Sequence, residues 1–237
     1  MTIGNITFVA GVLAALLLPL AGVGVRLGLW TFRTGFGVMR WAGYLGLAVA
    51  AISLVQLLVA QWRSPRPWRL GVALAFGLLA AGVPWYWRQR ARQVPPIHDI
   101  STDTQDPPAF VAVLPLRADA PNPATYEGAE IAAAQAQAYP DVRPLELPAT
   151  PPAAAFGRAL DAARAEGWAI VAADSAEGRL EATATTGWFG FKDDVVVRIR
   201  AAGAGSRIDV RSMSRVGRSD VGTNARRIRE YLSRLAD

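Results

Sequence analysis

The sequence contains no cysteine. That absence excludes a disulfide framework, a cysteine nucleophile and a metal site built on thiolates. Two nucleotide-binding signatures are also missing, because neither G-x-x-x-x-G-K-[ST] nor G-x-G-x-x-G occurs. No serine lies in the strand-to-helix turn that exposes the nucleophile of a hydrolase. The sequence therefore predicts no catalytic residue and no cofactor.

Acidic residues are absent from the first 92 positions, which nevertheless contain nine arginines. The remaining 16 basic residues and all 19 acidic residues lie in residues 93–237, whose net charge is −3. The formal charge of +6 on the whole chain thus comes from the ends of apolar segments, where arginine contacts lipid headgroups. A protein that binds duplex nucleic acid needs its positive field on a soluble face. We therefore expect no nucleic-acid partner.

Three apolar stretches, at about residues 6–25, 42–61 and 70–87, reach the length of about 18 residues that marks a membrane span. Their middles contain no ionisable residue, which also argues against a path for protons or ions. Residues 1–8 contain no Lys or Arg, so the first stretch does not resemble a cleaved signal peptide. Aromatic residues gather at the ends of the stretches, the depth that amphipathic rings prefer: Trp30, Trp41, Tyr44, Trp62, Trp68, Trp85, Tyr86 and Trp87. We predict a three-helix transmembrane anchor over residues 1–92, with the lipid bilayer as its partner.

The composition of the chain changes at residue 93, where the long apolar stretches end. Residues 93–149 are rich in proline, which forbids long helices, so we predict an extended segment packed on the soluble domain. Within it, residues 110–114 could form a short strand and residues 126–139 one short helix.

Residues 150–237 predict an α+β domain. Thr150 is a good N-cap for a helix that buries Ala155, Phe156 and Ala159. Four strands follow at residues 168–172, 179–186, 195–200 and 207–214, and a helix that starts near Ser219 or Asp220 closes the chain. Short turns between the strands favour an antiparallel meander. The predicted fold is a two-layer α-β-β-β-β-α sandwich in which two helices cover one face of the sheet and the other face meets water.

Two loops, residues 187–194 after the second predicted strand and residues 215–220 after the fourth, must lie at the same edge of the sheet. In a meander of antiparallel strands, alternate connections lie at the same end. In one reading their arginines and a helix N-terminus form an anion pocket beside aromatic residues that could hold an acyl chain or a headgroup. In the other, Arg215 or Arg218 pairs with Asp193 or Asp194, and the aromatics close the core. The candidate binding residues are Trp188, Phe189, Phe191, Lys192, Asp193, Asp194, Arg215 and Arg218.

The single histidine, His98, lies close to Asp99, Asp103 and Asp106. A histidine with carboxylates can bind a divalent metal, so His98, Asp99 and Asp103 are candidate ligands. The alternative is a hydrogen-bonded extended segment, since no helical or strand period fixes the geometry of these side chains.

Three blocks of sequence resemble the bacterial and plastid domain-of-unknown-function 1499 family: PPIHDISTDTQDPPAF (95–110), GWFGFKDDVVVRIR (187–200) and IDVRSMSRVGRSDVGTNARRIREYL (208–232). The resemblance covers about residues 94–237. It implies that the proline-rich segment belongs to the domain, and it carries no established activity. Family members with a single N-terminal anchor or a lumenal address imply an extracytoplasmic domain.

We therefore expect a multi-pass protein of the bacterial inner (plasma) membrane. The side of the membrane on which the C-terminal domain lies is predicted differently by the arginines of the short loops and by the family resemblance. Three arginines lie on the side that includes the N-terminus: Arg63, Arg66 and Arg69. Six arginines lie on the side of the C-terminal domain: Arg26, Arg33, Arg40, Arg88, Arg90 and Arg92. By the positive-inside rule the domain is cytoplasmic; by the resemblance it is periplasmic.

Three hypotheses for function remain. The first is a non-enzymatic, membrane-anchored module that binds a protein or lipid partner at the membrane surface. The second is a metal-dependent hydrolase or other enzyme that uses His98 with nearby carboxylates. The third is a structural subunit of an envelope complex.

Overall fold

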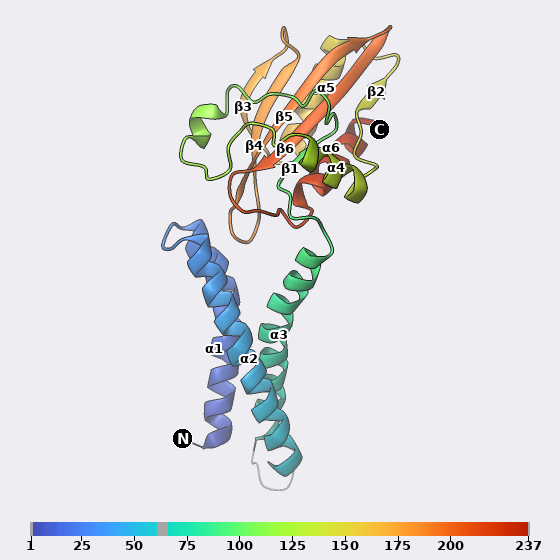
Figure 1. The fold of residues 1–237 in the computed structure, drawn as a ribbon. Coiled ribbons are helices and arrows are strands. Elements are labelled where there is room, and N and C mark those ends of the chain that lie inside the picture. Colours follow the sequence, from blue (N-terminus) through green and yellow to red (C-terminus); the bar gives the residue numbers. More distant parts are fainter. Residues whose placement is uncertain (1, 61–65, 237) are drawn as a thin grey trace. The chain divides into compact units, whose positions relative to one another are not determined.

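A computed structural model describes residues 2–60 and 66–236, and these form two compact units (Figure 1). The helical unit comprises Met1–Arg92 together with the short loop Gly187–Gly190, and the C-terminal domain comprises Gln93–Thr186 and Phe191–Asp237. Each unit is described by itself.

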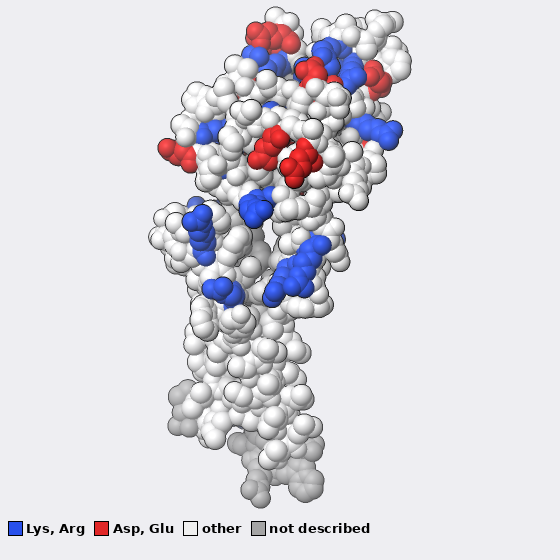
Figure 2. Space-filling view, in the orientation of Figure 1, with Lys and Arg blue, Asp and Glu red and all other residues white. Residues whose placement is uncertain are grey.

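The helical unit contains three helices long and apolar enough to cross a membrane, as predicted: α1 (Ile3–Arg26), α2 (Phe32–Ala60) and α3 (Pro67–Arg92). The helices extend beyond the apolar stretches, most of all at α2, which begins ten residues before the predicted start at residue 42. Those ten residues carry aromatic and arginine side chains that suit the interface rather than the hydrocarbon. Gln61, Trp62 and Arg63 lie outside the described residues. On the face drawn in Figure 2, the middle of the helical unit carries no charged side chain.

Small residues allow the three helices to approach closely. A Cβ atom added at Gly46 would lie 2.6 Å from the carbonyl oxygen of Gly77, and one added at Gly77 would lie 2.6 Å from that of Gly46. Ala14, Ala42 and Ala80 are fully buried in the same unit. In lipid the hydrophobic effect does not drive helices together, so they associate through close packing at small residues.

The C-terminal domain is built on a six-stranded antiparallel sheet in the order β1-β6-β5-β4-β3, with β2 also paired to β6. The meander β3 (Ala169–Asp174), β4 (Arg179–Thr185), β5 (Lys192–Ala202) and β6 (Gly205–Ser214) was predicted. The short strands β1 (Asp99–Ser101) and β2 (Leu145–Leu147) were not, because three residues between prolines show no alternation.

The helices α5 (Pro152–Ala165) and α6 (Thr223–Ala236) cover one face of the sheet, and α4 (Ala129–Ala138) confirms the helix predicted in the proline-rich segment. The main core lies between them and the sheet; Tyr231 stacks on Trp168 there at 4.7 Å between ring centroids and donates a hydrogen bond to the carbonyl oxygen of Ala159.

Three local predictions were wrong. Residues 110–114 form no strand, because their chain turns into the 3-10 helix η1 (Leu114–Arg117) with Pro115 in its first turn. Pro151, not Thr150, holds the N-cap position of α5, and the Thr150 carbonyl instead accepts a hydrogen bond from the hydroxyl of Ser206. The closing helix starts at Thr223, after a turn in which Val221 has a φ of 54°.

The second face of the sheet was predicted to meet water, and this was also wrong. Val196 and Met213 on that face form a small core with Phe110 and Val113 from the proline-rich segment. Charged side chains of the same face, including Glu181 and Asp209, are fully buried. The strands do alternate between apolar and polar residues, but the proline-rich segment covers the polar face. The charged side chains of that face can be buried because they have partners within the protein.

Candidate functional site

Glu181 on β4 holds the proline-rich segment against the sheet. Its two carboxylate oxygens accept hydrogen bonds from the backbone N–H groups of Val111, Ala112 and Val113 at 2.9–3.1 Å. Arg179 adds an ion pair at 3.3 Å. A fully buried carboxylate is costly unless such donors surround it, so these contacts fix the conformation of residues 111–113.

Asp194 on β5 fixes the far end of the same segment. One carboxylate oxygen accepts a hydrogen bond from Arg117 at 2.6 Å, and Arg215 donates to both oxygens at 2.8 and 2.9 Å. Thr183 donates a further hydrogen bond at 2.7 Å. Burial alone raises the pKa of the Asp194 carboxyl, but the hydrogen bonds from Arg215, Thr183 and Arg117 outweigh it and hold that pKa below its usual range. Asp194 is therefore ionised and fully engaged.

Asp99 on β1 forms a third buried pair. Arg211 donates to both of its carboxylate oxygens, at 2.9 and 2.7 Å, and to the carbonyl oxygens of Pro108 and Ala124. The Arg211 guanidinium lies 4.8 Å from the ring centroid of Phe110 and 5.4 Å from that of Tyr126. Burial and the nearby Asp99 raise the pKa of Tyr126 to about 12, so the phenol stays protonated. The arrangement clamps the proline-rich segment over the sheet.

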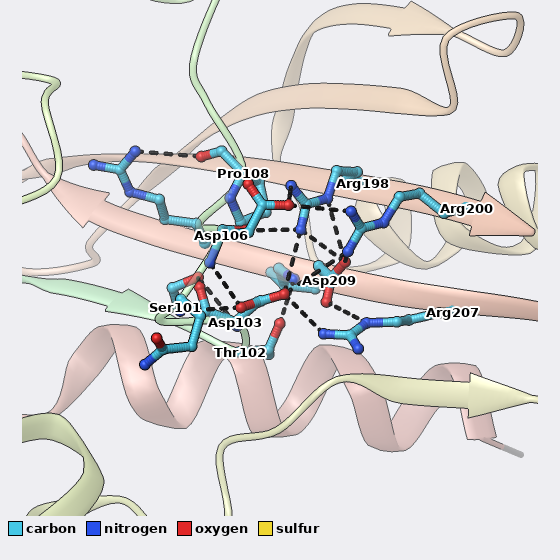
Figure 3. Close-up of polar contacts among 12 residues, drawn as sticks. Ser101, Thr102, Asp103, Asp106, Pro108, Arg198, Arg200, Arg207 and Asp209 are labelled. Carbon is cyan, nitrogen blue, oxygen red and sulfur yellow. Dashed lines mark hydrogen bonds and ion pairs between the residues drawn. The ribbon is translucent and has the colours of Figure 1, made fainter. Parts of the chain in front are cut away.

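A fourth network lies where the polar face becomes more exposed, and Figure 3 shows its side chains converging on Asp209 from β5, β6 and the loop after β1. The ion pairs join three arginines to three aspartates at 2.8–3.1 Å: Arg198, Arg200 and Arg207 with Asp103, Asp106 and Asp209. The charges balance, which leaves no uncompensated cation to attract an anionic ligand.

On the helix-covered face, Asp193 pairs with Arg227 of α6 at 2.6 Å, and Arg227 also donates to the hydroxyl of Ser212 at 3.0 Å. Asp220 precedes α6 and accepts the backbone N–H groups of Gly222 and Asn224. Burial, with the nearby Asp193, raises the pKa of Asp220 despite those hydrogen bonds.

A pocket of about 160 Å³ opens beside Trp168, Thr185, Arg226 and Glu230. It is smaller than the roughly 300–1,000 Å³ typical of sites that enclose a small molecule.

The predicted edge of the sheet is only partly assembled. Arg215 is the arginine that pairs with Asp194, whereas Arg218 is exposed and makes no ion pair within residues 2–60 and 66–236. Asp193 and Asp194 lie within β5 rather than in a loop and point to opposite faces of the sheet. These two aspartates can be buried within a strand because each forms an ion pair with an arginine.

The remaining residues of that edge are divided between the two units. Trp188 and Phe189 belong to the loop that groups with the helical unit, where the Phe189 ring lies 5.1 Å from that of Phe36. Phe191 donates its backbone N–H to the hydroxyl of Thr186, and Lys192 donates to the hydroxyl of Thr185 at 2.8 Å.

The candidate metal ligands are likewise occupied elsewhere. Asp99 is engaged by Arg211 and Asp103 by Arg207 at 2.8 Å. His98 is buried; its carbonyl oxygen accepts hydrogen bonds from Ser214 and Asn224, and its Nε2 has no hydrogen-bond partner among the described residues. In the part of the chain that the structure describes, no group of three or more His, Asp or Glu side chains could hold a metal ion.

An exposed apolar loop is the feature that sequence reasoning missed. Val111, Leu114 and Leu116 are 46%, 43% and 53% exposed, the most exposed large apolar side chains among the described residues of the C-terminal domain. We call residues 111–116 the apolar loop. A signal for its scaffold was present: Val196 and Met213 are apolar at positions that alternation assigns to the outer face, which indicates that chain covers them.

These contacts hold the buried carboxylates of the domain in place. Glu181, Asp194 and Asp99 are each held by several donors, and a general base or nucleophile needs a free lone pair within reach of a substrate. The buried charges instead orient the apolar loop, which presents its side chains on a fixed backbone.

Comparisons with known proteins identify a family for the domain. No curated protein matches the sequence. The family model described as "Protein of unknown function (DUF1499)" matches residues 99–235, which include all six strands and all but the last residue of α6. The chain therefore belongs to the DUF1499 family.

Proposed function

We propose that this chain is a non-enzymatic, membrane-anchored module that binds a protein partner through its apolar loop. The observation that carries the proposal is the exposure of Val111, Leu114 and Leu116 within six residues of a loop that buried charges hold in place. Exposed apolar side chains on a monomer mark interaction sites when they cluster.

Preorganisation supports the same function. Ordering a loop when a partner binds costs roughly 0.5–1.5 kcal/mol for each immobilised side chain. In this domain Glu181 and Asp194 fix the backbone on both sides of Leu114 before any partner arrives. Functional loops are characteristically mounted on rigid scaffolds in this way.

Charge favours a protein over an anionic lipid as the partner. Residues 93–237 carry a net charge of −3, and Asp119 is the exposed charged residue next to the apolar loop. An anionic bilayer surface attracts clusters of Lys and Arg, which this loop does not have.

Site-specific photocrosslinking in cells that express the full chain tests the proposal. A photoreactive amino acid at Leu116 is expected to give discrete protein adducts, and Leu114→Asp is expected to reduce them at least fivefold. The matched control places the same amino acid at Ala204, an exposed position in the turn between β5 and β6. Equal adducts at both positions, or adducts to lipid alone, would overturn a protein partner.

Two other results would favour the alternatives. Adducts with stoichiometric partners of a stable assembly would favour a structural subunit of an envelope complex. Stoichiometric metal in the purified chain, lost in His98→Ala, would favour the metal-dependent enzyme.

We also propose a bacterial inner membrane as the location, and the side of the domain can be measured directly. Because the sequence contains no cysteine, Ala204→Cys introduces a single thiol. Labelling of intact cells by a membrane-impermeant maleimide indicates a periplasmic domain, as the family resemblance implies. Labelling only after lysis indicates the cytoplasmic side that the arginine count favours.

A further inference from the structure

A polar cluster lies within the helical unit where α1 begins, α2 ends and α3 begins. Arg69, in the first turn of α3, donates a hydrogen bond from Nη1 to Oδ1 of Asn5 on α1 at 2.7 Å. Gln56 on α2 donates to the hydroxyl of Thr7 on α1 at 3.1 Å. The contacts of Asn5 and Thr7 thus join all three helices through hydrogen bonds between polar side chains.

Two aromatic rings hold the Arg69 guanidinium in place. Its Cζ atom lies 5.9 Å from the ring centroid of Phe8 and 5.5 Å from that of Trp68. The two rings themselves meet edge to face at 6.1 Å. Cation–π contacts of this kind fix the orientation of the guanidinium without neutralising its charge.

No carboxylate in residues 1–92 can compensate that charge, because the segment contains no Asp or Glu. The Nε atom of Arg69 is buried and has no hydrogen-bond partner within the described residues. The same holds for Oε1 of Gln56 and for the hydroxyl of Ser53, a residue that is fully buried on α2. Buried groups of this kind are destabilising unless a further partner satisfies them.

We propose that Arg69 and Asn5 form a binding site for a phosphate group, such as the one carried by a phospholipid headgroup. The planar guanidinium matches the oxygens of a phosphate, and the hydrogen bond to Asn5 uses only one of its five N–H donors. The amide nitrogen of Asn5 offers a second donor beside it. Arg69 lies at the start of a helix able to cross a membrane, next to Trp68, which is the depth where phosphates occur.

The chain contains a matched control for Arg69. Arg33 near the start of α2 also lies over an aromatic ring, at 5.8 Å from the centroid of Phe32, but its side chain is exposed. Arg33 therefore shares the charge and the cation–π contact of Arg69, without the buried polar surroundings.

Native mass spectrometry of the full-length chain released from detergent tests the site. Phosphatidylglycerol is titrated in one arm and inorganic phosphate in the other. We expect Arg69→Gln to weaken phosphatidylglycerol binding about tenfold, the effect of losing one charge-assisted hydrogen bond, and Arg33→Gln to change it less than twofold. Glutamine keeps an amide donor for Asn5, so the helix contact survives the substitution.

Arg69→Lys provides a second variant that keeps the charge and loses the fork, and we expect a threefold to fivefold weakening. Dependence on Arg69 in the inorganic phosphate arm alone would support the phosphate site and assign it to free phosphate rather than lipid. Equal losses in the Arg69 and Arg33 variants, or no loss in either arm, would overturn the proposal.

Discussion

The arginines of the helical unit and those of the C-terminal domain differ in what they contact. In the domain, Arg117, Arg211 and Arg227 are each buried against an aspartate at 2.6–2.7 Å. In the helical unit no carboxylate exists in residues 1–92, and Arg69 and Arg33 lie over aromatic rings instead. The same side chain therefore fixes a fold where acids accompany it and remains available to an external anion where they do not.

The comparison also shows what the charged side chains of the domain contact. A buried ion pair is weak evidence for stability, but breaking it by removing one partner is costly because a charge stays buried alone. Here the pairs connect β-strands to residues 99–126, and they specify the position of the apolar loop. These charges order the proline-rich segment against the sheet.

The largest effect is expected from Arg211→Met, which leaves Asp99 buried without its cation. We expect the free energy of unfolding of the domain to fall by about 3–5 kcal/mol. Pulse proteolysis of the full chain in urea measures it. Adding Asp99→Leu should recover much of the loss, because removing both charges leaves none uncompensated. Strict additivity of the two substitutions would contradict the pairing.

A smaller effect is expected from Asp194→Asn, about 3 kcal/mol at pH 7. Because the folded-state pKa of Asp194 lies below its unfolded value of about 3.9, its stabilisation is fully present above that value and is lost as the pH falls through the folded pKa. The difference between wild type and variant should therefore narrow below about pH 4. Urea denaturation at pH 7, 5 and 3.5 follows it.

Asp141→Asn is the control for that experiment. The Asp141 pKa is also lowered, by the hydrogen bond from Arg229, but the pair is exposed. We expect less than about 1 kcal/mol at any pH, since solvent screens the interaction. A loss as large as that of Asp194→Asn would break the distinction between buried and exposed pairs.

The smallest effect is expected from Arg218→Glu, which should change the free energy of unfolding by no more than about 0.5 kcal/mol. Arg215→Gln, three residues away, should cost about 1–3 kcal/mol because it removes donors from buried Asp194. Equal losses in the two variants, again by pulse proteolysis, would contradict the assignment of Asp194 to Arg215.

The sequence alone predicted the elements that repeat a local pattern. The three long apolar helices, the β3–β6 meander and the helix at α4 follow from hydropathy and alternation within one segment. The cover on the second face of the sheet could not be predicted in this way. It depends on pairs such as Asp99 with Arg211, which are 112 residues apart in the chain.

The candidate site shows the same limit. The pairing of Arg215 with Asp194 was among the predicted alternatives, because a meander brings those loops to one edge. The participation of Arg117 and the exposure of Leu114 were not predicted, since nothing local in a proline-rich segment reveals which residue another part of the chain will bury.

The place of β6 in the sheet also sets an order for biosynthesis. This strand pairs with β5 on one side and with both β1 and β2 on the other, yet it is the last strand to be made. At translation rates of about 5–20 residues per second, Asp99 leaves the ribosome roughly 6–22 s before Arg211. Throughout that interval β1 and β2 lack the strand they pair with, so the first and last parts of the sheet can join only when synthesis of β6 is finished.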